Sequence, residues 1–176
     1  LMQDQDTLNA RTRDTRDRLI RAGLALFSRQ GLDGVRTRQL VDEAGVNQSA
    51  IPYHFGGKEG VYAAVLEQVA AGIVDRLDLR RPAPTSAEAA RVALKSLMRD
   101  FARTLLDSEA STAGSLLLAR EQLRPTEKFD ALYTRLFLPL HTNVADLVAD
   151  IRNETRGHRD QVLRAHAILG LSLIHI

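Results

Sequence analysis

Cysteine is absent from this chain of 176 residues, so neither a disulfide framework nor a zinc site built on thiolates can form. That absence suits the reducing environment of the cytosol. Charge of one sign is not in excess either, because 24 Lys and Arg residues stand against 22 Asp and Glu residues and leave a net charge of +2. Nucleic-acid binding would therefore have to depend on a local feature, since the whole chain is not polybasic.

Long hydrophobic runs are also missing. The longest apolar stretch, 165–176, is too short to span a membrane, and it contains His166 and His175. No segment resembles a signal peptide. We therefore expect a soluble, cytoplasmic protein that has no membrane partner.

Alternation of polar and apolar residues at period two is not sustained, whereas apolar residues recur at helical spacing along most of the chain. With 44% hydrophobic residues, the chain can bury a core in one or two domains. The predicted fold class is all-α. Metalloprotease, phosphate-loop and dinucleotide motifs do not occur, and no two histidines have the i, i+4 spacing of a helical zinc site. We therefore expect no metal and no cofactor.

The N-terminal residues predict an arm followed by a helix. Residues 1–12 are polar and poor in apolar side chains, which predicts a mobile arm. Apolar residues recur at helical spacing from Thr15 onward, and Gly31 is placed to end this first helix.

Two short helices are predicted next. Thr37 can cap a second helix that runs through Ala44, and Gly45 supplies a turn. Asn47 can cap a third helix that begins at Gln48. The three helices together predict a homeodomain-like helix-turn-helix domain at residues 13–60.

The remaining sequence predicts a larger helical bundle at residues 61–176. A long fourth helix follows the Gly56-Gly57 break, and residues 80–86, which include two prolines, separate it from the next helix. We then expect a fifth helix with a capping box of Thr85 and Glu88, a sixth from Gly114 to Leu123, a seventh that opens at Pro125 and is kinked by Pro139, and a last helix from about Arg159.

The helix-turn-helix motif suggests a chemistry for its polar residues. In such a motif the N-terminal residues of the second helix face base edges in the major groove, where Asn47, Gln48 and Ser49 stand. Thr37, Tyr53 and Lys58 supply hydroxyl and ammonium groups that suit phosphates. His54 can touch DNA or pack under the fourth helix, and Lys58 with Glu59 can also be simple solvent-exposed charges of a first helical turn.

The same segment resembles the TetR/AcrR family of transcription regulators. The matching residues are Thr37-Arg38, Ala44-Gly45-Val46, Tyr53-His54-Phe55 and Lys58-Glu59. The resemblance implies phosphate contacts by Thr37, Tyr53 and Lys58, and base contacts by Arg38, Gln48 and Ser49. Pro52 departs from the family pattern, because many relatives have an aromatic residue there.

The second half resembles the CecR-type branch of that family. The matching element is Arg120-Glu121-Gln122-Leu123, followed by Pro125-Thr126. The resemblance implies a regulator linked to transport and antibiotic sensitivity. Candidate residues for binding a small-molecule effector are Met98, Phe101, Leu117, Arg120, Phe137 and His141. The apolar ones can equally be ordinary core, and Arg120 can be a surface or salt-bridged residue.

These observations predict a regulator and not an enzyme: a homodimer that binds a palindromic double-stranded DNA operator and is released by a small-molecule effector. Activation instead of repression stays open. A helical-bundle enzyme and a helical interaction module are the rival classes, and neither explains the polar residues at the start of the third helix. The chain stops at Ile176 inside an apolar helical pattern, so we expect the last domain to be truncated or to end in foreign sequence.

Overall fold

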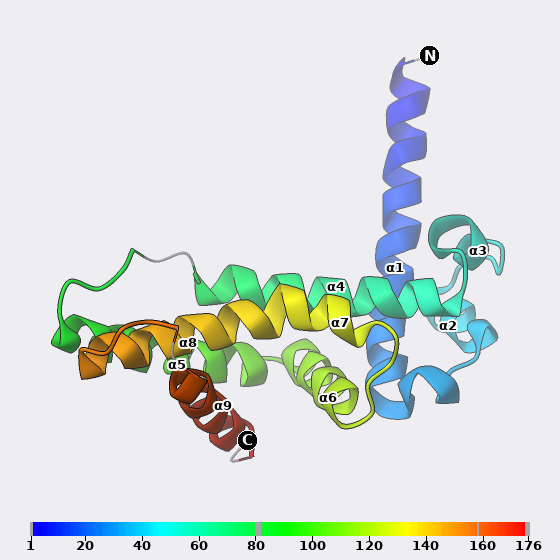
Figure 1. Ribbon diagram of the computed structural model, residues 1–176. Coiled ribbons are helices and arrows are strands. Elements are labelled where there is room, and N and C mark those ends of the chain that lie inside the picture. Colours follow the sequence, from blue (N-terminus) through cyan, green and yellow to red (C-terminus); the bar gives the residue numbers. More distant parts are fainter. Residues whose placement is uncertain (1, 80–81, 158, 175–176) are drawn as a thin grey trace. The chain divides into compact units, whose positions relative to one another are not determined.

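A computed structural model describes residues 2–79, 82–157 and 159–174, and within these ranges it consists of helices and their connections, without strands (Figure 1). The all-α prediction is confirmed. The chain divides into two compact units, of which unit 1 comprises Leu1–Val69 and Ser108–Phe129 and unit 2 comprises Ala70–Asp107 and Asp130–Ile176. No helix in the described ranges combines the length and the hydrophobicity needed to cross a membrane.

Unit 1 is built around the long first helix. Its elements are α1 (Met2–Gly34), α2 (Thr37–Ala44), α3 (Ala50–Phe55), the first part of α4 (Lys58–Leu77) and α6 (Glu109–Leu123). Helix α1 packs against α2, α3 and α6. The rings of Phe27 in α1 and Tyr62 in α4 meet edge to face, with centroids 5.0 Å apart. This buried contact fixes α4 against α1 at the centre of the unit.

The start of α1 differs from the prediction. The element is helical from Met2 and not only from Thr15. Polarity did not decide the structure there, because residues 2–12 contain no proline or glycine and include several good helix formers. Gly31 interrupts the helix where the sequence predicts its end: with φ 71° and ψ 177° it breaks the helical geometry, and a short second helical segment continues across this kink to Gly34.

The caps of α2 and α3 differ by one or two residues from the prediction. Arg36 precedes α2 as its N-cap, and its N–H donates to Oε1 of Gln39 at 2.8 Å, so Thr37 is the first helical residue. Gly45 supplies the predicted left-handed turn with φ 61°. Oδ1 of Asn47 accepts from the N–H of Ser49 at 3.1 Å, and α3 starts at Ala50 instead of Gln48.

Unit 2 contains the second part of α4 and the elements α5 (Ala87–Leu106), η1 (Tyr133–Phe137), α8 (Leu138–Arg152) and α9 (Arg159–Ile174). It also contains α7 (Phe129–Leu132) except for its first residue, which belongs to unit 1. Helix α8 packs against both α5 and α9. The three helices contribute buried apolar side chains, among them Leu97, Phe101, Leu140, Val144, Ala149, Ala165 and Leu169. Helix α8 is thus the central helix of the unit.

Three boundaries in the second half are corrected. Oγ of Ser86, not the side chain of Thr85, caps α5 by accepting from the N–H of Ala89 at 3.1 Å. Helix α6 begins at Glu109 and not at Gly114. The next helix begins at Phe129, four residues after Pro125. Directly before Pro139, which has no N–H to donate, the helix widens into the π turn η1.

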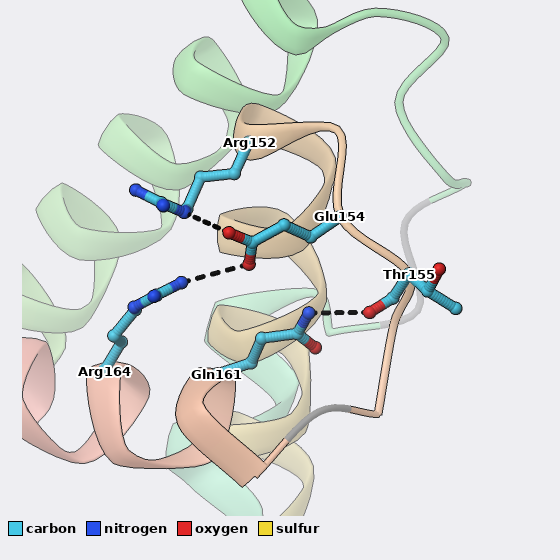
Figure 2. A network of polar contacts seen from close by, with 5 residues as sticks. All are labelled: Arg152, Glu154, Thr155, Gln161 and Arg164. Carbon is cyan, nitrogen blue, oxygen red and sulfur yellow. Dashed lines mark hydrogen bonds and ion pairs between the residues drawn. The ribbon is translucent and has the colours of Figure 1, made fainter.

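Polar side chains hold the connection between α8 and α9 (Figure 2). The carboxylate of Glu154 accepts from Nε of Arg152 at 2.5 Å and from Nη1 of Arg164 at 3.0 Å. Nε2 of the buried Gln161 donates to the carbonyl of Thr155 at 2.7 Å. These contacts tie the end of α8 to the first turns of α9, so the two helices form one hairpin.

Candidate nucleic-acid interface

Helices α2 and α3 have a buried apolar side and an exposed polar side. Leu40, Val41, Ala44 and Ile51 are buried and attach the pair to the core of unit 1. The turn between the helices is held by Arg18 of α1, whose Nη2 donates to the carbonyl of Gly45 at 2.9 Å. Glycine suits this turn because its φ of 61° lies in the left-handed region, which L side chains rarely adopt.

Six of the eight predicted DNA-binding residues are exposed on this pair of helices and their turn: Thr37, Arg38, Asn47, Gln48, Ser49 and Tyr53. Tyr53 is 79% exposed, which is unusual for an aromatic side chain. Arg38 makes only a loose surface ion pair with Asp42, at 3.8 Å. The arrangement presents hydroxyl, amide, guanidinium and phenol groups to solvent, as a surface that binds bases and phosphates requires.

The three polar residues before α3 are not equivalent. Both the N–H and the hydroxyl of Ser49 donate to Oδ1 of Asn47, at 3.1 and 3.2 Å, so these two residues orient each other. The side chain of Gln48 has no partner within the described part of the chain. Gln48 is therefore the one of the three whose amide is fully available for a base edge.

His54 and Lys58 are half-buried. Nζ of Lys58 donates to the carbonyl of Leu32 near the end of α1, at 2.9 Å. An ammonium has three donors, so this bond leaves two for a phosphate. The ring of His54 lies edge-on to Tyr53, with centroids 4.8 Å apart. The two alternatives for His54, packing and DNA contact, are both compatible with this position.

Sequence reasoning missed Arg16, which α1 contributes to the same region. Its guanidinium carbon lies 5.4 Å from the centre of the Phe55 ring at the end of α3. The side chain is exposed, so it adds positive charge beside α3. Helical periodicity could show only that Arg16 lies on a polar face, since its proximity to Phe55 depends on how α1 packs against α3.

The predicted effector-binding residues are divided between the two units. Leu117 and Arg120 belong to unit 1, whereas Met98, Phe101, Phe137 and His141 belong to unit 2. Leu117 is fully buried, and Nη2 of Arg120 donates to the carbonyl of Arg29 in α1 at 3.0 Å. Arg120 is thus engaged with a helix of its own unit.

His141 has a neighbour that its sequence position did not indicate. Its ring centroid lies 4.1 Å from that of His166 in α9, and its Nδ1 lies 2.6 Å from the carbonyl oxygen of Phe137. Burial lowers the pKa of His141, and the nearby His166 acts in the same direction. The neutral imidazole is therefore the favoured form at neutral pH.

Two hollows lie in unit 2. A groove of about 1010 Å³ is lined by parts of α4, α7, η1 and α8, with Asp75, Asp78, Asp130 and Arg135 among its polar residues. A smaller hollow of about 190 Å³ has Asp146, Asp150 and Arg156 in its wall. None of the six predicted effector residues lines either hollow. Across the described ranges, no three His, Asp or Glu side chains are grouped so that they could hold a metal ion.

Known protein families match both halves of the chain. Residues 19–65 match the family described as bacterial regulatory proteins, tetR family. Residues 90–176 match the C-terminal domain of the HTH-type transcriptional dual regulator CecR.

Individual relatives and solved structures agree. The HTH-type transcriptional dual regulator CecR of Shigella flexneri is 30% identical over 162 residues, which cover 86% of this chain and 71% of that protein. The HTH-type transcriptional repressor NicS of Pseudomonas putida is 37% identical over 73 residues, 39% of this chain and 34% of that protein. A crystal structure of a transcriptional regulator from Rhodococcus sp. Rha1 matches with a TM-score of 0.67 and 22% identity, over 90% of this chain and 82% of that one. This last likeness concerns the fold.

Proposed function

Because the chain belongs to the TetR family of bacterial regulatory proteins and has a CecR-type C-terminal domain, we propose that it is a ligand-relieved repressor that binds a palindromic operator as a homodimer in the cytoplasm. Membership of the family makes it a DNA-binding transcription regulator and not an enzyme. The observation that carries the proposal is that α2 and α3 expose polar side chains on one side and bury apolar side chains on the other.

Each residue of this surface has a proposed role. Gln48 reads a base edge, for which an amide suits adenine, and Arg38 and Ser49 also contact bases. Thr37, Tyr53 and Lys58 contact phosphates and set the register without reading sequence. Asn47 acts mainly through Ser49, which it holds by two hydrogen bonds. His54 supports Tyr53 from the side.

The proposed homodimer uses the α8–α9 hairpin. Leu163 and Val162 of α9 are 62% and 45% exposed, and Leu138 of α8 is 45% exposed. Apolar side chains of this size in one hairpin favour burial against a second copy of the chain. The two copies of α3, as recognition helices related by a two-fold axis, then fit half-sites about 34–36 Å apart.

A substitution tests this interface. Leu163→Asp is expected to weaken self-association at least tenfold in sedimentation equilibrium, because it places a charge in the proposed apolar contact. Val92→Asp is the matched control, since Val92 is 61% exposed but lies on α5. Equal effects of the two substitutions would contradict the placement of the interface.

The effector is proposed to bind in unit 2, where the groove lies. The effector can bind more tightly to a dimer in which the two copies of α3 are spaced so that they do not fit the operator. Linkage then requires that DNA and effector weaken each other's binding. Repression is the proposed outcome, as for the relative named a repressor. The relative named a dual regulator makes activation at some promoters the alternative.

Selection of genomic DNA fragments by the purified protein tests the function. We expect a shared palindromic sequence, bound with an affinity that falls as salt rises. Binding without sequence preference would overturn the operator, and a single unpaired half-site would overturn the palindrome. Binding to no DNA at all would favour the rival reading of an interaction module that keeps the motif as a scaffold.

A further inference from the structure

Two adjacent residues of α6, Arg120 and Glu121, contact different helices of unit 1. Nη2 of Arg120 donates to the carbonyl of Arg29 in α1 at 3.0 Å. Glu121 is fully buried, and its Oε1 accepts from the hydroxyl of Tyr62 in α4 at 2.6 Å. The pair therefore fixes α6 to α1, which packs against α2 and α3, and to α4, which begins with Lys58.

Both carboxylate oxygens of Glu121 accept hydrogen bonds. Its second oxygen, Oε2, accepts from the N–H and the hydroxyl of Thr126, at 3.3 and 3.2 Å. Burial, followed by the hydrogen bond to Glu121, raises the pKa of Tyr62, so the phenol stays protonated and remains a donor. A buried carboxylate that keeps three donors holds its position firmly, because breaking any of these bonds leaves a buried charge less well solvated.

The Arg120 contact is incomplete. Its Nε is buried and has no acceptor within the described part of the chain. The side chain lies along the kink in α1, where its Cδ is 3.3 Å from the place that a Cβ of residue 31 would occupy. Gly31 has a positive φ of 71° there, which favours glycine. Release of Arg120 from α1 therefore costs less free energy in broken hydrogen bonds than release of Glu121 from α4.

The same kinked end of α1 also binds Lys58. Nζ of Lys58 donates to the carbonyl of Leu32, three residues after the carbonyl that Arg120 binds. Lys58 is the first residue of α4 and follows the Gly56-Gly57 break after the recognition helix. Arg120 of α6 and Lys58, one of the predicted phosphate-binding residues, thus both bind the short segment of residues 29–34.

We propose that Arg120 couples α6 to Lys58 through the kinked end of α1, while the Glu121 contact keeps α6 in place on α4. This inference rests on the proposed function, since it assigns the regulation of the DNA-binding surface. Arg120 is then a positioning residue for DNA binding, in place of the effector anchor expected from the sequence. When the Arg120 side chain leaves the carbonyl of Arg29 while α6 stays on α4, residues 29–34 are freed and Lys58 loses its fixed position.

A double-mutant cycle with Arg120→Gln and Lys58→Gln tests the coupling on a selected operator fragment. Arg120→Gln is expected to weaken binding about tenfold and to lower the salt slope by less than one, because it loosens the phosphate contact of Lys58 without removing the ammonium. Lys58→Gln is expected to lower the salt slope by about one. The double variant should bind more tightly than the product of the two losses implies. Losses that simply multiply would overturn the proposal.

The matched control is Arg124→Gln, which removes an exposed arginine from the end of the same helix. It should leave operator affinity within twofold. Arg120→Lys keeps a cation that can reach the Arg29 carbonyl, so it should restore part of the lost affinity. Equal losses for the variants at 120 and 124 would contradict a specific role for Arg120.

Hydrogen exchange of the free protein separates this proposal from the proposed function, because it needs no DNA. Arg120→Gln should speed exchange in peptides that cover residues 29–34 and the start of α4, and leave α8 unchanged. If the wild-type protein bound no operator but this change appeared, the coupling would stand and the regulator function would fall. Unchanged exchange at residues 29–34 would overturn the coupling, whatever the protein binds.

Discussion

The predicted DNA-binding surface and the predicted effector site differ in how far apart their residues lie in the sequence. All eight residues of the first lie within positions 37–58, on two short helices, the turn between them and the first residue of α4. The six residues of the second extend from position 98 to 141 and fall into two compact units. Six residues of the first set are exposed and the other two are half-buried beside them in sequence, whereas the second set does not gather around either hollow described in unit 2.

The difference shows what sequence periodicity can and cannot specify. Within a helix-turn-helix, the turn glycine and two helical periods already determine which residues point away from the core. Phe101 and Phe137 were correctly recognised as apolar residues at helical spacing, and both are buried. Periodicity cannot tell a buried residue that lines a pocket from one that fills the core, because that depends on the packing of separate helices.

The largest expected effect concerns the junction that follows the recognition helix. A Cβ on Gly60 would lie 1.8 Å from the carbonyl oxygen of Phe55, a backbone atom that no rotamer change can move away. We expect Gly60→Ala to cost about 3 kcal/mol of unfolding free energy or more, at the upper end of overpacking effects, and to abolish operator binding. Thermal denaturation and a DNA titration measure the two losses.

The same helix offers the control. Nothing lies within 4 Å of a Cβ built on Gly72, which also belongs to α4 but to unit 2. Gly72→Ala should raise stability by roughly 0.5–1 kcal/mol, because alanine loses less entropy in a helix. Loss of DNA binding in both variants would show that the surface depends on all of α4 and not on its junction with α3.

Much of the fold could be predicted; the errors at helix caps have local causes, and the missed neighbours have non-local ones. Arg36 and Ser86 cap helices where Thr37 and Thr85 were expected, since adjacent residues can both serve and the sequence does not say which adopts the extended conformation. Arg16 and His166 were missed as neighbours of Phe55 and His141 because those pairs join different helices. The contact of Arg120 with α1 joins residues 91 positions apart, which no local pattern reveals.

An intermediate effect is expected on the DNA-binding surface, where Lys58 and Gln48 should behave differently. Lys58→Ala should weaken binding to all sequences and lower the salt slope by about one, because it removes a phosphate contact. Gln48→Ala should relax the preference at one base position by about 1–3 kcal/mol and leave the slope unchanged. Titrations against operator and single-base variants at several salt concentrations measure both.

These two variants sharpen the comparison between the regions. Both residues lie within one short segment, so a clear separation of their effects would show that the local motif specifies individual roles as well as a surface. Equal losses on every sequence would instead indicate that Gln48 only supports the fold of α3.

The smallest effect concerns unit 2 and its pair of histidines. The pKa of His141 lies below its usual value of 6.5, first because the ring is buried and also because His166 is close. The folded protein therefore binds a proton at this site less readily than the unfolded chain does. Its contribution to stability is complete above about pH 6.5 and is lost as the pH falls through 6.5 toward the lower folded value.

Melting temperatures between pH 7.5 and pH 5 test this assignment. The wild-type protein should lose more stability over that range than His141→Gln, which cannot take up a proton there. His166→Gln should remove only part of the difference, because burial is the larger cause of the lowered pKa and the charge of the neighbour is the smaller one. A variant at position 166 that removed all of the pH dependence would reverse that order, and it would make the contact between α8 and α9, rather than the burial of His141, the feature of unit 2 that responds to pH.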